Sequence, residues 1–308
     1  MNSSIAKLTE MTKNEVTEAM MALQDRMCVL LEDIDGKGIF LEDTWSRPEG
    51  GGGRTRIIED GDLIEKGGVN FSEVYGQVTD IMRQNTEITG ESFFATGVSI
   101  VLHPNNPHVP IIHMNVRYFE MDNGTYWFGG GIDLTPHYIV PSQAKEFHES
   151  LKSICDKYNS AFYSKFKVWA DDYFFIPHRN ETRGIGGIFF DHISESDTSS
   201  KQALLDFCIE LGDSFSEIYN VQAEQGRKKT FTQAEIDWMN YRRGRYVEFN
   251  LVNDRGTKFG LVSGGRTESI LMSLPKNAGW TYNIELEDGS PEKLTLSQLR
   301  KGVDWFSI

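Results

Sequence analysis

The stretch that decides the fold runs from Ile111 to Leu134 and reads IIHMNVRYFEMDNGTYWFGGGIDL. Up to Glu120 apolar and polar side chains alternate, which predicts a β-strand with two unlike faces. One face carries Ile112, Met114, Val116 and Tyr118, and the other carries His113, Asn115 and Arg117. Because Asn123-Gly124 is a strong signal for a two-residue turn, the stretch predicts an antiparallel hairpin with one polar face.

The strand predicted before this hairpin, over Phe93 to His103, has the same character. Its apolar face carries Val98, Ile100 and Leu102. If His103 pairs with His113 across the connecting loop, Ser99 lies opposite Arg117 on the polar face. A solvated sheet face is the common explanation of such alternation. Since a solvated face is usually made of Lys, Glu and Thr, we favour a functional site here.

A glycine run, Gly129-Gly130-Gly131, interrupts the second strand of the hairpin. With Asp122 opposite Thr125, Arg117 lies opposite the middle glycine. Glycines inside a strand mark a bulge or the close approach of another group. We therefore expect room for a flat ligand beside Arg117. Simple alternation places Asp133 on the opposite face, so its presence in the site requires a bulge in the glycine run.

The remaining segments place strands and helices in separate blocks. Further strands are predicted over 38–45, 54–59 and 125–134, and helices over 12–30, 147–169, 204–218 and 296–303. A capping pattern at Thr232-x-x-Glu235 predicts a short helix before a late hairpin, over 244–253 and 257–263, and Gly264-Gly265 precedes a predicted helix over 266–274. This arrangement predicts an α+β fold in one domain, 1–308, with a large antiparallel β-sheet flanked by α-helices on both sides.

The composition limits the kinds of function. Among 308 residues, Lys and Arg total 31 and Asp and Glu total 45, and the net charge of −14 argues against nucleic acid as a partner. Cys28, Cys155 and Cys208 form no C-x-x-C pair and fit reduced thiols in a cytoplasmic protein. Because the sequence shows no leader and no apolar run of ~18 residues, we expect a soluble chain without a membrane span. Dinucleotide, P-loop, H-E-x-x-H and G-x-S-x-G motifs are absent.

Arginines recur beside glycines in this acidic chain. Over residues 240–266 six basic side chains stand against two acidic ones. Guanidinium suits bidentate capture of carboxylates, and glycine-rich backbone can form an anion-binding concavity. This local basic patch predicts an anionic small-molecule substrate, with Arg117 and Arg266 as its better ligands. Ordinary surface pairing or an oligomer interface is the favoured interpretation of three others: Arg242, Arg243 and Arg245.

The seven histidines admit more than one interpretation. A given histidine is more often a structural hydrogen-bonding residue than a ligand or catalyst. Imidazoles could gather a divalent metal, or act as proton donors without one, and their long sequence gaps do not decide between these roles.

Seven longer strings stand out along the chain. They are GVS (97–99), HMNVRYF (113–119), WFGGGIDLTP (127–136), HRNETRGIGG (178–187), RRGRYVEFNL (242–251), DRGT (254–257) and GGRTES (264–269). Together they resemble the oxygen-dependent coproporphyrinogen III oxidase family. The resemblance covers nearly the whole chain, from about Arg47 to the C-terminus.

The resemblance implies a function and a set of functional positions. The implied reaction is oxidative decarboxylation of two propionates of coproporphyrinogen III to vinyl groups in heme biosynthesis. It gives protoporphyrinogen IX, with O2 consumed and CO2 and H2O2 released, and it uses no flavin, NAD or iron–sulfur cluster. The implied substrate-binding positions are Ser99, Asn115, Val116, Arg117, Gly264, Gly265 and Arg266. His113 matches a proton donor. The positions assigned to a divalent metal, which some members do not need, match four histidines: His103, His113, His148 and His178. A homodimer is implied, with its interface around 242–276.

The residues themselves suggest how such a substrate is held. We expect Arg117 and Arg266 to bind propionates, and Asp133 with Asp254 to bond pyrrole N–H groups and stabilise developing positive charge. Two alternatives stay open from the sequence. One is a metal hydrolase that uses the four histidines, and the other is a tetrapyrrole carrier without O2 uptake.

Overall fold

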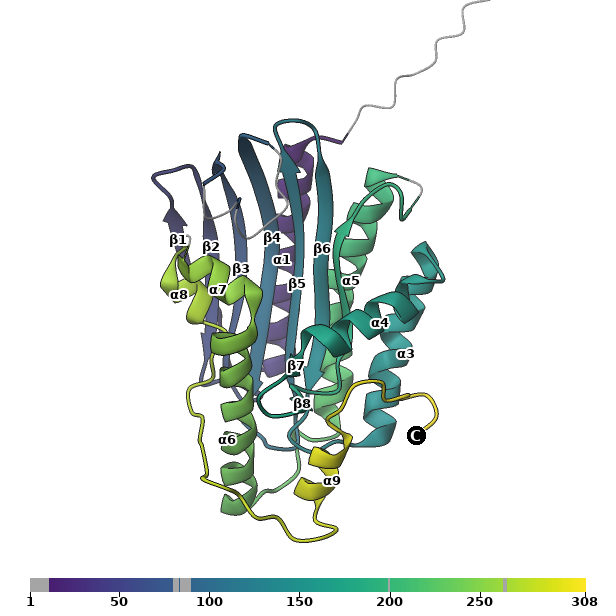
Figure 1. The fold of residues 1–308 in the computed structure, drawn as a ribbon. Coiled ribbons are helices and arrows are strands. Elements are labelled where there is room, and N and C mark those ends of the chain that lie inside the picture. Colours follow the sequence, from purple (N-terminus) through teal and green to yellow (C-terminus); the bar gives the residue numbers. More distant parts are fainter. Residues whose placement is uncertain (1–10, 80–82, 84–89, 199, 263–264) are drawn as a thin grey trace, which may run out of the picture.

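Seven strands form one antiparallel sheet in the order β1-β2-β3-β4-β5-β6-β9 (Figure 1). The computed structural model describes residues 11–79, 83, 90–198, 200–262 and 265–308. The strands are β1 (Leu41–Ser46), β2 (Gly51–Glu59), β3 (Ile64–Gln77), β4 (Ser92–Pro104), β5 (Ile111–Met121), β6 (Tyr126–Thr135) and β9 (Gly187–Ile193). A separate pair, β7 (Phe175–Ile176) and β8 (Glu181–Thr182), lies outside this sheet. The predicted antiparallel sheet is confirmed, although the sequence did not predict β3 and β9.

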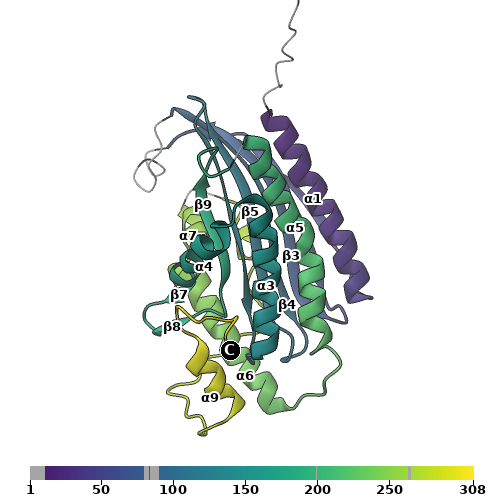
Figure 2. The same cartoon turned by 90° about the vertical axis from the view of Figure 1, so that its right-hand side faces the viewer.

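Helices cover both faces of the sheet, as predicted. One face is covered by α1 (Lys13–Asp35), α3 (Pro141–Tyr158) and α5 (Lys201–Glu224), as Figure 2 shows. In front of the other face in Figure 1 lie α6 (Gln233–Glu248), the π-helical turn η1 (Phe249–Asn253), α7 (Arg255–Val262) and α8 (Thr267–Leu271). Among the described residues, α4 (Phe162–Tyr173) and α9 (Pro291–Gln298) are further helices. In the described part of the chain, no helix combines the length and apolarity needed to cross a membrane.

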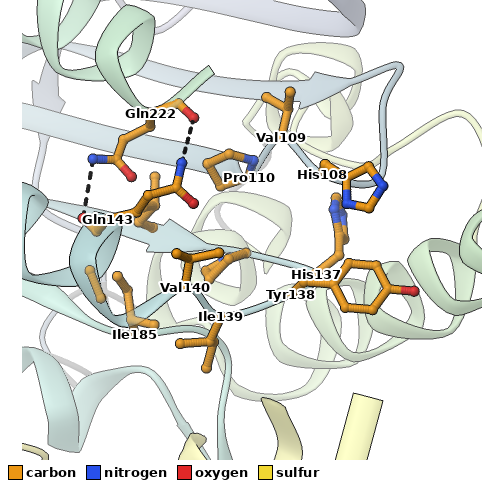
Figure 3. Close-up of a pocket in the computed structure, with 13 residues that line it drawn as sticks. His108, Val109, Pro110, His137, Tyr138, Ile139, Val140, Gln143, Ile185 and Gln222 are labelled. Atoms are coloured by element: carbon orange, nitrogen blue, oxygen red, sulfur yellow. Dashed lines mark hydrogen bonds between the residues drawn. The ribbon is translucent and has the colours of Figure 1, made fainter. Parts of the chain in front are cut away.

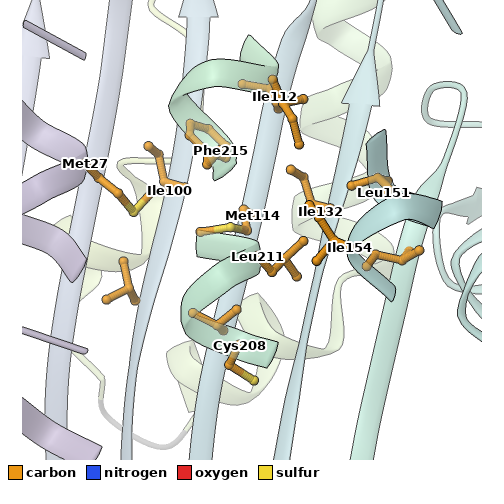
Figure 4. Packing of buried hydrophobic residues seen from close by; sticks show 14 of the residues in the cluster. Met27, Ile100, Ile112, Met114, Ile132, Leu151, Ile154, Cys208, Leu211 and Phe215 are labelled. Atoms are coloured by element: carbon orange, nitrogen blue, oxygen red, sulfur yellow. The ribbon is translucent and has the colours of Figure 1, made fainter. Parts of the chain in front are cut away.

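The main core fills the space between the sheet and the first helical layer. Even-numbered side chains of the central strands point into it, including Ile100, Met114 and Ile132, and they meet Met27 of α1 and Leu211 of α5 (Figure 4). All five are at most 1% exposed. Burial of each such side chain stabilises the fold by roughly 1.5–3 kcal/mol. The predicted apolar faces of β4 and β5 are therefore confirmed as the core side of the sheet.

The pairing of β4 with β5 differs from the prediction. Ser99 lies opposite Asn115, and Val101 rather than His103 lies opposite His113. The register is therefore displaced by two residues. Because side chains alternate with a period of two, such a displacement leaves every side chain on its predicted face. Alternation alone cannot distinguish the two registers.

The turn between β5 and β6 also differs, with a larger consequence. The Met121 N–H donates to the Thr125 carbonyl over 2.8 Å, which leaves a three-residue connection instead of two. Gly124 adopts a φ of +83°, as the left-handed residue of such a connection does. The extra residue moves the register by one and places Asp133 directly opposite His113. Asp133 thus shares the face of His113 without a bulge between β5 and β6, and the irregularity in the glycine run, between Phe128 and Gly130, lies in the pairing of β6 with β9.

The late hairpin predicted over 244–263 is wrong within the described residues. Helix α6 continues to Glu248 and passes through η1 into α7. All residues from Tyr241 to Tyr246 are buried in this helix, and Tyr246 packs on Val101 and Ile111 of the sheet. Packing against the sheet therefore outweighs the strand preference of the local sequence. The helix predicted after Gly265 is confirmed as α8, although it is shorter than predicted.

Candidate functional site

The candidate site is the odd-numbered face of β4, β5 and β6, on the side of α6, α7 and α8. It brings together five predicted residues: Ser99, His113, Asn115, Arg117 and Asp133. Side chains that pair directly across an antiparallel sheet lie on the same face. His113 and Arg117 are four residues apart along β5, a separation of about 13 Å. Val116 points the other way into the core and is 0% exposed, so only its backbone can reach a ligand.

His113 is held in place by a buried carboxylate. Its Nδ1 lies 2.8 Å from Oδ1 of Asp133, and its ring packs edge-on against Phe174. The side chain of His113 is 23% exposed, whereas that of Asp133 is 1% exposed. Since Nδ1 is used by the carboxylate, Nε2 is the ring nitrogen left for a ligand.

Arg183, which sequence reasoning did not assign to the site, completes this group. Its Nη2 lies 2.7 and 2.8 Å from the two oxygens of Asp133, and its Nη1 lies 2.9 Å from Oδ1 of Asn250. Its guanidinium carbon is 4.5–4.6 Å from the centroids of three rings: Phe174, Tyr246 and Phe249. These rings come from the segment before β7 and from α6–η1. Because these segments are far apart in the sequence, the position of Arg183 in the site could not be predicted from the sequence.

The electrostatics of this group keep Asp133 ionised. Burial by itself would raise the pKa of Asp133, but the Arg183 guanidinium and His113 outweigh burial and hold it below the usual value. Burial likewise opposes the charge on Arg183, and Asp133 raises its pKa in return. The pair therefore stays charged inside the protein, with its hydrogen bonds satisfied.

The two predicted catalytic carboxylates have different surroundings. Both oxygens of Asp133 accept from Arg183, and the side chain is buried, so in this arrangement it faces protein groups. Asp254, between η1 and α7, is half-buried. It accepts from the Tyr173 hydroxyl over 2.7 Å and from the Thr257 N–H over 2.6 Å. Each oxygen of Asp254 retains a lone pair, so Asp254 is the better placed carboxylate for contact with a ligand.

Arg117 is anchored within the sheet face. Its Nη1 donates to Oδ1 of Asn115 over 3.0 Å, and its Nη2 pairs with Oδ2 of Asp191 over 2.8 Å. Arg117 lies opposite Gly129, not Gly130 as predicted. A Cβ at Gly129 would lie 2.6 Å from Asp191 and 2.9 Å from Arg117. The room left by this glycine is thus filled by the ion pair rather than reserved for a flat ligand.

Arg266 lies over the opposite end of the same face. It precedes α8, pairs with Asp43 of β1, and has Nη1 3.4 Å from the Ser269 hydroxyl. From β1 to β5, the strand of Arg117, there are four strand spacings, or about 19 Å. The Gly265 N–H donates to the Gly260 carbonyl, and Gly264 lies outside the described residues.

The four histidines predicted as metal ligands have separate partners. Nε2 of His103 bonds the Ser273 carbonyl, both ring nitrogens of His148 are used by Ile185 and Tyr163, and Nε2 of His178 bonds Glu248. Burial lowers the pKa of His103 and of His148 to about 3, so both rings are neutral. Over the described ranges, no three His, Cys, Asp or Glu side chains form a group that could hold a metal ion. The residues therefore do not fit a four-histidine metal site, and the hydrolase alternative lacks its ligand set.

Three other arginines occupy the interior, contrary to the surface role favoured from the sequence. Arg242 and Arg243 are fully buried and Arg245 is 5% exposed. Their carboxylate partners within the chain include Glu181 for Arg242, Glu65 for Arg243 and Glu248 for Arg245. The three arginines belong to α6 and fasten this helix to its surroundings.

Two hollows lie away from this face. A cavity of about 10 Å³ beside the β4–β5 connection is lined by His137, Gln143 and Gln222, and it has room for about one water (Figure 3). A second hollow of about 320 Å³ lies near the start of α1, where Lys13, Tyr75 and Phe94 contribute to its wall. None of the predicted site residues lines either hollow.

The chain belongs to the coproporphyrinogen III oxidase family, whose sequence model matches residues 15–305. Three curated relatives from Prochlorococcus marinus carry the name oxygen-dependent coproporphyrinogen-III oxidase. The protein of strain NATL1A is 46% identical over 312 residues, which cover 94% of this chain and 89% of that protein. The protein of strain MIT 9312 is 45% identical over 97% of this chain and 93% of its own length. The protein of strain SARG is 43% identical, with 99% and 95% covered.

Proposed function

We propose that this chain catalyses the oxygen-dependent conversion of coproporphyrinogen III to protoporphyrinogen IX in heme biosynthesis. Each of two propionates, CH2-CH2-COOH, loses CO2 and two hydrogens and becomes a vinyl group, and O2 takes the two electrons and two protons as H2O2. Family membership and the names of the relatives support this reaction. O2 is the co-substrate, and no step proposed here needs a metal.

The observation that carries the proposal is the distribution of cations on the open sheet face. Arg117 on β5 and Arg266 before α8 are 37% and 27% exposed, so both guanidinium groups can meet a ligand. Arg266 pairs with Asp43 of β1, and β1 lies four strand spacings, or about 19 Å, from β5, which suits a broad ligand with carboxylates on opposite sides. Guanidinium groups bind carboxylates in bidentate geometry. We assign one substrate propionate to each arginine.

Ser99 and Asn115, on the sheet face between the two arginines, also support the binding of the substrate there. The two residues face each other across β4 and β5, and Asn70 of β3 is the next in this row. All three side chains are half-buried. Their hydroxyl and amide groups offer hydrogen bonds without charge. We propose that this row, with the backbone of Val116, fixes the height of the macrocycle above the sheet. Substrate binding is also proposed for Gly264 and Gly265, as the resemblance to the family implies.

We propose that His113 holds or donates the proton at Nε2 beside the reacting side chain. Asp133 fixes the ring through Nδ1, and Arg183 fixes Asp133, so the three groups form one rigid unit. In this arrangement Asp133 acts through His113, and the contact with pyrrole N–H groups passes to the half-buried Asp254. A carboxylate beside the ring stabilises positive charge as it develops there.

We also propose the setting in which the enzyme works. The chain, 1–308, acts as one domain, and it forms a homodimer through the segment around 242–276. Four apolar side chains of this segment are exposed and support an interface: Leu251, Val252, Leu261 and Val262. A cytoplasmic location is supported by three cysteines that are buried and unbridged.

Oxygen uptake and product fluorescence, measured together on the purified protein, test this function. With coproporphyrinogen III we expect one O2 consumed for each vinyl group formed, and no product under nitrogen. Chelation should leave the rate unchanged, because the described histidines form no metal group. Binding without O2 uptake would indicate a carrier instead, and full activity under nitrogen would contradict the proposed reaction.

A further inference from the structure

Both arginines assigned to substrate carboxylates already face a carboxylate of the protein. Arg117 pairs with Asp191 of β9, and Arg266 pairs with Asp43 of β1. Strands β1 and β9 are the two edges of the sheet. The two ends of the candidate site are thus built alike. At one end the arginine lies within the sheet, on β5, and at the other it precedes α8 above the sheet, and in both cases the aspartate comes from the nearest edge strand.

We propose that Asp43 and Asp191 are exchangeable counter-ions that occupy the places of two substrate carboxylates until the substrate binds. This inference rests on the proposed function, in which Arg117 and Arg266 bind propionates. In the free protein each aspartate keeps its arginine extended over the face. An arriving propionate replaces the aspartate on the guanidinium, so a ligand must offer two widely spaced carboxylates to replace both.

The exposure of the pairs supports exchange. The side chains of Arg117 and Asp191 are 37% and 23% exposed, and those of Arg266 and Asp43 are 27% and 56% exposed. Ion pairs in contact with water gain little from each other, so a second carboxylate can replace the first at small cost. The pair of Arg183 with Asp133 is the opposite case, at 2% and 1%, and such a buried pair does not open cheaply.

The sheet is shaped to admit one of these pairs. The missing side chain at Gly129 leaves the space in which Asp191 meets Arg117, since a Cβ there would approach both of them within 2.9 Å. Asn115 holds the other terminal nitrogen, Nη1, of Arg117 at 3.0 Å. Arg117 can therefore keep its position on Asn115 while its Nη2 changes partners.

The exchange also has a consequence for the end of each reaction step. When a propionate leaves as CO2, the guanidinium that held it loses its partner. The nearby aspartate can then return to the arginine, which lowers the affinity for the decarboxylated product. Asp43 and Asp191 would in this way oppose substrate binding weakly and favour product release.

Neutral variants of the aspartates test this inference. Binding of coproporphyrinogen III under nitrogen, followed by tryptophan fluorescence, is compared in wild type, Asp191→Asn, Arg117→Ala and the double variant. We expect Asp191→Asn to bind several-fold more tightly, and this gain to vanish when Arg117 is also replaced. Aerobic turnover of Asp191→Asn should be slower at saturation, with more of the singly decarboxylated intermediate. Asp43→Asn should behave in the same way, through Arg266.

The possible failures of the two ideas are distinguishable. If Arg117→Ala weakens binding and Asp191→Asn weakens it too, or leaves it unchanged, the counter-ion role is wrong while the clamp stands. If Arg117→Ala itself binds normally, the assignment of Arg117 to a propionate is wrong, and the counter-ion role falls with it. Asp213→Asn is the matched control, because Asp213 pairs with Arg26 on two helices of the other layer and should change neither binding nor turnover.

Discussion

Replacement of Arg183 by methionine tests the buried unit that positions His113. Methionine keeps much of the apolar stem of the side chain but leaves the Asp133 carboxylate without its cation. Asp133 is 1% exposed and receives three hydrogen bonds from Arg183. Removal of one partner from a buried ion pair costs roughly 3–5 kcal/mol. The guanidinium also lies over three aromatic rings, and each cation–π contact contributes about 0.5–2 kcal/mol.

We therefore expect Arg183→Met to lower the free energy of unfolding by at least about 3 kcal/mol at pH 7. Urea unfolding followed by tryptophan fluorescence measures this change. The double variant Asp133→Asn/Arg183→Met removes both charges and should be more stable than Arg183→Met alone. Additive effects of the two replacements would refute the argument from an uncompensated charge. Arg26→Met, at an exposed ion pair, is the control and should change stability by less than about 1 kcal/mol.

The pH dependence of the same variant gives a second check with a defined sign. In wild type the pKa of Asp133 in the folded protein lies below its usual value. The carboxylate therefore stabilises the fold fully above the pKa of the unfolded chain, and this stabilisation is lost as the pH falls through the pKa of the folded protein. Without Arg183, burial raises the pKa of Asp133, and protonation then favours the folded state. The difference in stability between wild type and Arg183→Met should shrink from pH 7 to pH 4, and a constant difference would contradict this account.

Three further predictions concern other parts of the structure. The free energy of unfolding should fall from pH 7 to pH 5, by up to about 1.4 kcal/mol per pH unit for each of His103 and His148. The unfolded chain takes up protons near the ordinary histidine pKa, whereas burial holds the pKa of both rings at about 3, and His148→Gln should reduce the slope in urea titrations. Although burial opposes it, hydrogen bonds from Arg179, His178 and Trp280 lower the pKa of Glu248 to about 2, so its contacts should persist above pH 4.5 and weaken as the pH falls toward 2. Hydrogen exchange of the 178–180 turn should show this loss, and Glu248→Gln should exchange quickly already at pH 7. Gly129→Ala should raise KM several-fold with a smaller effect on kcat, since its Cβ would displace Arg117, and unchanged kinetics would contradict that role.

Alternation in the sequence predicted the faces of the sheet but not its registers. A displacement of two residues between β4 and β5 is invisible in the pattern, because both registers keep Ser99 and His113 on the same face. A displacement of one residue has the opposite effect. The three-residue turn after Met121 brought Asp133 to the face of His113, and Asn-Gly suggested a two-residue turn. The predicted face of Asp133 therefore depended on whether the turn between β5 and β6 has two or three residues.

Strands without clear alternation were harder to predict. Strand β3 contains Gly67-Gly68 and charged residues on both faces, and β9 begins with a short apolar run, 187–190, without alternation. The segment around Tyr246 is rich in residues that favour strands, yet tertiary packing makes it helical. Secondary structure at these places was decided by neighbours that lie far away in the sequence.

The candidate site divides in the same way. Arg117, His113 and Ser99 could be predicted because a polar set on one strand face is a local signal. Arg183 and Asp191 could not be predicted. Arg183 gains its role only when the segment after β8 reaches Asp133 of β6, and Asp191 only when β9 pairs with β6. The family resemblance implied a metal at four histidines, whereas the fold directs each of the four rings to its own protein partner.

A crystal structure of the protein with coproporphyrin III, the oxidised and air-stable form of the substrate, would show directly whether Arg117 and Arg266 bind substrate carboxylates. We expect a macrocycle on the odd-numbered face of β4 and β5, with one carboxylate ~3 Å from the Arg117 guanidinium and another at Arg266. Nε2 of His113 should face the ring. A macrocycle bound elsewhere, such as the hollow beside Lys13 and Tyr75, with Arg117 still on Asp191, would contradict it.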